Sequence, residues 1–146
     1  GAHVVGLARR EDRGAALADE IVKAGGRFTF RRCDIDDVGQ CQALIEAGMR
    51  VRYTGLRQTP EMIVHLAQEQ QPDVIALSSM AGSHVPFCEK LTPLLEKAGL
   101  ANRLCVIGGN LPIRDHDHLR QLGFRGIFPS SSRLDDIVNY IRANVS

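Results

Sequence analysis

Six short apolar runs, separated by stretches with helical periodicity, constrain the fold of this 146-residue chain more than any other feature. They are short apolar runs rather than clean alternations, and they begin at His3, Arg27, Arg50, Asp73, Arg103 and Gly126. Such runs are typical of parallel strands buried on both faces, and parallel strands are usually joined by helices. The pattern predicts an α/β fold with a doubly wound, six-stranded parallel sheet in a three-layer αβα sandwich.

Two strand orders fit this pattern. A Rossmann-like order, 3-2-1-4-5-6, places the run from His3 in the central slot. A flavodoxin-like order, 2-1-3-4-5, is the alternative, with the run from Arg27 in the central slot. One helix start is marked strongly, because Thr59 precedes Pro60 as a cap followed by a first-turn proline. Ligands of either fold bind at the carboxyl ends of the strands.

Composition narrows the function classes. The chain has 18 Lys and Arg against 17 Asp and Glu, a formal charge of +1, which argues against a nucleic-acid or polybasic membrane surface. No apolar run approaches the ~20 residues of a membrane span. The cysteines show no CxxC spacing, and they are Cys33, Cys41, Cys88 and Cys105, the last within an apolar run that predicts a core position. We therefore predict that the thiols are reduced and that the protein is cytoplasmic. Residues 1–146 are expected to form a single domain, and no protein partner is evident.

The second part of the chain, from Ala47 to Ser146, closely resembles the cobalamin-binding domain of methylmalonyl-CoA mutase and its relatives. The resemblance rests on "AGMRVRYTGLRQTPEMIV", "DVIALSSMAGSH", "LCVIGGNLP" and "LGFRGIFPSSSRLDDIVNYI". It implies that three loops at strand ends contact the nucleotide tail of a corrinoid. The matching positions are Ser78, Ser79 and Met80 for a Ser-x-Leu motif, Gly108 and Gly109 for a Gly-Gly turn, and Pro129 and Ser130 for a Pro-Gly-Thr-like loop.

The cobalt-ligating motif of that family, Asp-x-His-x-x-Gly, has no match in this sequence. One alignment uses the loop that begins at Asp34 and places Asp36 at the histidine position. Another uses "REDRGA" and places Glu11 there. A carboxylate is a poor substitute for the nitrogen donor that cobalt takes at this position. The prediction is weak or absent cobalamin binding, with no metal site formed by the protein alone.

The first part, from Gly1 to Glu46, resembles the second strand to fourth helix of a short-chain dehydrogenase/reductase, a Rossmann fold. The resemblance implies that Arg9 and Arg10 contact the 2′-phosphate of NADP and that Asp34 approaches the adenine. The Gly-rich turn and the Tyr-x-x-x-Lys pair of that family are both absent, so no dehydrogenase activity is expected.

Together the two resemblances suggest a chimera, and no catalytic residue set is apparent. The resulting hypothesis is an engineered, non-catalytic scaffold derived from a cobalamin-binding module, with weak or no corrinoid binding and no enzymatic activity. The alternative is a nucleotide-binding module that uses Arg9, Arg10 and Asp34.

Two further groups of polar residues each have two interpretations. His84 follows a predicted ligand-side loop, so it is either a polar contact to a corrinoid or a surface histidine. The sequence "DHDH", from Asp115 to His118, contains residue types that bind metals but is also typical of a helix start.

Overall fold

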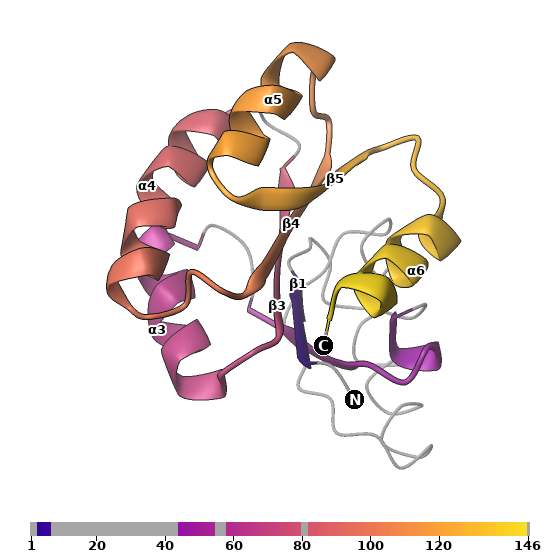
Figure 1. Cartoon of the computed structure of the whole chain (residues 1–146), viewed down its shortest axis with the longest axis horizontal. Helices are drawn as coiled ribbons and strands as arrows, with labels where there is room; N and C mark the ends of the chain where they lie inside the picture. Colours follow the sequence, from indigo (N-terminus) through magenta and orange to yellow (C-terminus); the bar gives the residue numbers. More distant parts are fainter. Residues whose placement is uncertain (1–2, 7–43, 55–57, 80–81, 146) are drawn as a thin grey trace, which may run out of the picture.

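The computed structural model describes residues 3–6, 44–54, 58–79 and 82–145, whose strands form one parallel sheet (Figure 1). The strands are β1 (His3–Gly6), β2 (Arg50–Tyr53), β3 (Val74–Ser79), β4 (Leu104–Gly109) and β5 (Phe124–Pro129). They lie in the order β2-β1-β3-β4-β5, and every neighbouring pair is parallel. This order is flavodoxin-like, so the predicted α/β fold with a parallel sheet is confirmed.

Each of the two predicted arrangements is right in one respect and wrong in another. β1 pairs directly with β2 on one side and with β3 on the other. The Rossmann-like order is wrong because it requires a strand between β1 and β2, but its placement of the run from His3 in the central slot is confirmed. The flavodoxin-like order is confirmed, but its central slot holds His3–Gly6 instead of the run from Arg27. The described part of the chain contains five strands, not the six predicted, and the run from Arg27 lies outside it.

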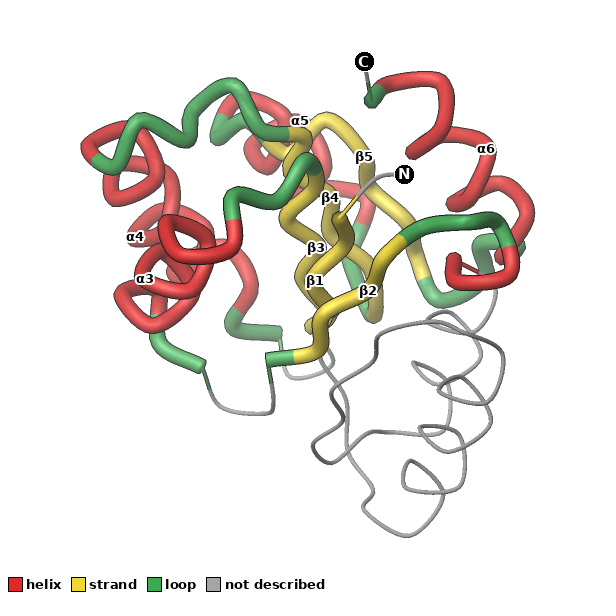
Figure 2. The backbone as a smooth tube through the Cα atoms, turned by 90° about the horizontal axis from the view of Figure 1, so that it is seen from below, coloured by secondary structure: helices red, strands yellow, loops and turns green. Residues whose placement is uncertain are grey.

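Helices cover both faces of the sheet. The four that the structure describes in full are α3 (Pro60–Gln70), α4 (His84–Lys97), α5 (Ile113–Gln121) and α6 (Leu134–Asn144). The predicted start of α3 is confirmed, because the Thr59 side chain accepts a hydrogen bond of 3.2 Å from the Met62 backbone N–H. α3, α4 and α5 lie on one side of the sheet and α6 on the other, which gives three layers (Figures 1 and 2).

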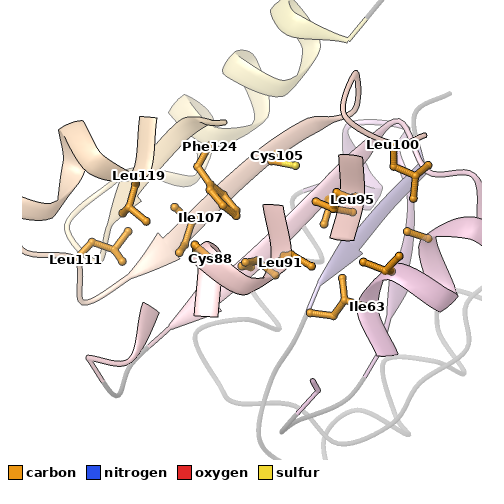
Figure 3. Packing of buried hydrophobic residues seen from close by; sticks show 14 residues of the cluster. Ile63, Cys88, Leu91, Leu95, Leu100, Cys105, Ile107, Leu111, Leu119 and Phe124 are labelled. Carbon is orange, nitrogen blue, oxygen red and sulfur yellow. The ribbon is translucent and has the colours of Figure 1, made fainter. Parts of the chain in front are cut away.

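Two hydrophobic clusters hold these layers together. Ile75 and Ile107 belong to the cluster on the face covered by α3, α4 and α5, together with Leu91 of α4. Figure 3 shows Ile107 and Leu91 in this cluster. Val74 and Val106, which directly precede the two isoleucines, belong to the second cluster, with Val138 and Ile141 of α6. Side chains alternate between the faces of a strand, so consecutive apolar residues fill both clusters. This explains why β3 and β4 appear in the sequence as apolar runs without alternation.

Cys88 and Cys105 are free and buried, so the predicted core position of Cys105 is confirmed. Burial raises the pKa of the Cys88 thiol to about 12 and that of the Cys105 thiol to about 11. Within the residues that the structure describes, no helix is long and apolar enough to cross a bilayer.

Candidate functional site

The carboxyl ends of β3, β4 and β5 bring together residues that the sequence predicted as neighbours. The register aligns two rows across the three strands, which are Ser78, Gly108 and Phe128, and then Ser79, Gly109 and Pro129. We call these six residues the strand-end row. Five of the seven predicted corrinoid contacts belong to it, and Ser130 directly follows it. Met80 lies outside the described residues.

Gly109 is a glycine because of its neighbour in the sheet. Its φ of +119° is a conformation that residues with a side chain rarely adopt. A Cβ at this position would overlap the backbone oxygen of Ser79 and lie 2.9 Å from the Ser79 carbonyl carbon. The same oxygen accepts a 3.0 Å hydrogen bond from the Asn110 backbone N–H. Strand packing alone therefore requires glycine at position 109.

Gly108 differs, because nothing in the described part of the chain excludes a side chain there. Its φ lies outside the positive range. The nearest atom to an added Cβ is the Phe128 backbone oxygen at 3.4 Å, which is ordinary contact. Apart from that oxygen and the Phe128 Cβ, and leaving aside the chain neighbours of Gly108, no described atom lies within 4 Å of the added Cβ. A close approach of a ligand to the backbone is thus compatible with the structure at Gly108.

The end of β5 is fixed by an aromatic pair. Phe128 and Tyr140 meet edge to face, with ring centroids 5.4 Å apart and an interplanar angle of 78°. The contact joins the last residues of β5 to α6. After Pro129 the chain turns, and the Ser132 backbone N–H donates to the Pro129 carbonyl at 2.8 Å. Ser130 is exposed in this turn.

His84 is a buried residue, so its interpretation as a surface histidine is wrong. Its side chain is 2% exposed, and its Nε2 lies 2.9 Å from Asp115 Oδ2. The partners are 31 residues apart in sequence, and no spacing rule pairs them. Sequence reasoning therefore named both residues without joining them.

The stretch from Asp115 to His118 lies within α5, as the helix interpretation expects. Among the described residues, no group of three or more His, Cys, Asp or Glu side chains could hold a metal ion. The four histidines whose side chains are described all have polar partners. These pairs are His65 with Glu69, His84 with Asp115, His116 with the Leu111 carbonyl, and His118 with Glu89.

The remaining histidine, His3, is the first residue of β1 and so lies at the amino end of that strand. The described residues therefore fit one part of a corrinoid and not another. The strand-end row fits the close approach of a tail, but no described histidine is free to reach a cobalt ion. Arg9, Arg10, Glu11, Asp34 and Asp36 lie outside the described residues.

Comparison with known proteins supports the second resemblance and not the first. Residues 41–142 match the model of the B12 binding domain. The chain is 32% identical over 105 residues to the 2-hydroxyisobutanoyl-CoA mutase small subunit of Aquincola tertiaricarbonis, covering 72% of this chain and 77% of that protein. It is 31% identical over 140 residues to the probable methylmalonyl-CoA mutase large subunit of Mycobacterium bovis, covering 90% of this chain and 19% of that protein.

A solved structure shares the fold. The cobalamin-binding protein from Desulfitobacterium hafniense superposes with a TM-score of 0.69 at 18% identity, over 99% of this chain and 59% of that one.

The Mycobacterium match covers all but a tenth of the chain, so it extends into residues 1–46. A chimera with a dehydrogenase therefore has no support.

The hypothesis of an engineered, non-catalytic scaffold is wrong, and with it the alternative of a nucleotide-binding module. The finding that overturns both is the match to B12-binding mutase relatives, which also leaves the predicted weakness of cobalamin binding without support. The predicted lack of a protein partner is equally at odds with a relative that is a small subunit. The chain belongs to the B12 binding domain family.

Proposed function

We propose that this chain binds cobalamin at the carboxyl edge of its sheet and presents it to a separate catalytic subunit that rearranges an acyl-CoA. The family match supports the first half of the proposal. The second half is supported by relatives that are CoA mutases, one of them a small subunit of which the match covers 77%.

The strand-end row is the observation on which the proposal depends. Gly108 leaves room for a group to approach the backbone, and the half-buried Ser78, its partner in the register, lies beside it on the same face of the sheet. Pro129 and Ser130 border the same place on the β5 side. These residues would hold and orient the nucleotide tail, with Met80 following Ser79 in the chain. Bound cobalamin would supply the organometallic chemistry that amino-acid side chains lack.

Isothermal titration of the purified chain with hydroxocobalamin tests the binding. We expect saturable binding of one corrinoid per chain, with competition by other complete cobalamins. Cobinamide, a corrinoid without the nucleotide tail, should bind more weakly, because it cannot fill the space beside Gly108. Absence of saturable heat and of any change in the visible spectrum would refute the proposal.

The partner half of the proposal has its own support at the same edge. Ile113 and Leu134 begin α5 and α6, the helices that follow β4 and β5, and are 84% and 38% exposed. Arg114 and Arg133 are exposed beside them. Apolar side chains with charged neighbours are typical of protein interfaces.

Mixing the cobalamin-loaded chain with a CoA mutase large subunit should give turnover that needs both chains. Turnover by this chain alone would contradict the proposed separation of cofactor binding and catalysis.

A further inference from the structure

Two histidine–carboxylate pairs join α4 to α5. The inner pair is His84 of α4 with Asp115 of α5, at 2.9 Å. The outer pair is Glu89 of α4 with His118 of α5, at 2.8 Å. In the inner pair the histidine side chain is 2% exposed and the aspartate side chain 24%, while both outer side chains are about half exposed, at 50% and 44%. The pairs share their chemistry and their helices, but not their surroundings.

Burying the polar side chain of His84 costs free energy of folding. It is the one polar side chain among the buried residues of the described chain, at 3% exposure. Its Nδ1 is buried and has no hydrogen-bond partner among the residues that the structure describes. Native proteins leave few such atoms unpaired, and an apolar residue of similar volume is often as stable at such a position. Stability alone does not account for a histidine there.

The position of the pair offers a reason. His84 is the first residue of α4, five residues after Ser79, where β3 ends. Asp115 lies in the first turn of α5, which follows the end of β4 at Gly109. The pair therefore ties together the two helix starts that follow β3 and β4, two of the three strands of the strand-end row.

We infer that His84 and Asp115 are positioning residues of the corrinoid site. Their hydrogen bond fixes the first turn of α4 against the first turn of α5, so that the two chain segments after β3 and β4 keep one separation before the ligand arrives. A site held in its binding shape loses less conformational freedom on binding. This inference rests on the proposed function, since the segments in question border the strand-end row.

The direction of the hydrogen bond follows from the chemistry of the partners. An ionised carboxylate only accepts hydrogen bonds, so the hydrogen lies on His84 Nε2 and is donated to Asp115 Oδ2. A glutamine at position 84 can place an amide N–H near the position of Nε2. A leucine there keeps the volume and removes the donor. These two variants separate the hydrogen bond from the filling of space.

The test compares His84→Gln, His84→Leu and the matched surface variant His118→Leu. Cobalamin and cobinamide affinities are measured by titration, and thermal unfolding identifies the variants that fold. Loss of one hydrogen bond to a charged group predicts that His84→Leu binds cobalamin about 10-fold more weakly, whereas His84→Gln and His118→Leu stay within about 3-fold of the native chain. Cobinamide binding should change little in all three, because it lacks the tail that the two segments border.

If His84→Leu does not fold, variants of Asp115 provide the test. Asp115→Asn keeps a hydrogen-bond acceptor for His84 Nε2. It should retain cobalamin affinity, whereas Asp115→Ala should lose it like His84→Leu. Equal losses in His84→Leu and His118→Leu, or equal losses for cobalamin and cobinamide, would overturn the positioning role. If the native chain itself binds no cobalamin, the proposed function fails instead.

Discussion

Gly109 and Ser79 face each other across β4 and β3 at a distance that leaves no room for a side chain. A Cβ on Gly109 would overlap the Ser79 carbonyl oxygen, which also accepts a hydrogen bond from Asn110. The Gly-Gly pair after β4 thus contains two glycines with different tasks. Gly109 serves the packing of the strands, and Gly108 leaves space at the candidate site.

Gly109→Ala should destabilise the fold. The substitution combines a positive φ with a backbone overlap at Ser79, and each such strain costs on the order of 1–3 kcal/mol. We expect the free energy of unfolding in urea to fall by at least about 2 kcal/mol. A change below about 0.5 kcal/mol would mean that the strand ends separate easily, which their register argues against.

Gly108→Ala should affect binding more than stability. The added Cβ meets only ordinary contact with Phe128, so the free energy of unfolding should change by less than about 1 kcal/mol. The methyl group would occupy the space proposed for the corrinoid tail, and cobalamin affinity should fall about 10-fold. Titration with hydroxocobalamin measures this, with cobinamide as the control ligand. Unchanged cobalamin affinity would remove Gly108 from the site.

The sequence was sufficient for the parts of the fold that depend on local chemistry. Apolar runs such as "VIALSS" predict buried parallel strands because both faces of each strand meet helices. Thr59 predicts the start of α3 because its hydroxyl caps a free backbone N–H. Ser79 and Gly109 also came together as predicted, since parallel strands of similar length end at the same edge.

The pairing of strands and the contacts between helices could not be predicted from the sequence. The runs from His3 and Arg27 are both apolar and short, so composition alone does not decide which of them pairs with β3. The pairing of His84 with Asp115 depends on how α4 packs beside α5, 31 residues along the chain. The reason for Gly109 was also missed, because its closest constraint is a backbone oxygen on another strand.

The buried thiols should make the fold sensitive to alkali. Burial raises the pKa of Cys88 from 9.0 to about 12 and that of Cys105 from 9.0 to about 11. Each thiol is therefore neutral in the fold where the unfolded chain would already ionise. This contribution to stability is complete below pH 9.0 and is lost as the pH rises through the folded values. Urea unfolding should show a falling free energy of unfolding over this range, with a shallower fall in Cys105→Ala.

The cobalt of bound cobalamin should receive no nitrogen from this protein. The described histidines are paired with other groups, and His3 begins β1 at the opposite edge of the sheet. The electron paramagnetic resonance spectrum of bound cob(II)alamin reports an axial nitrogen as a splitting of its lines. We expect identical spectra from protein grown with ¹⁴N and with ¹⁵N. A splitting that changes with the isotope would identify a protein ligand.

Ile113→Asp should separate partner binding from cofactor binding. Ile113 is 84% exposed at the start of α5, so replacing it leaves the core intact, and the free energy of unfolding should change by less than about 0.5 kcal/mol. A charge in an apolar contact weakens association, so the affinity for a CoA mutase large subunit should fall about 10-fold or more. Hydroxocobalamin affinity should stay unchanged. Glu96→Gln serves as the control, because Glu96 is exposed near the far end of α4. Equal loss of association in both variants would show that the partner does not contact the start of α5.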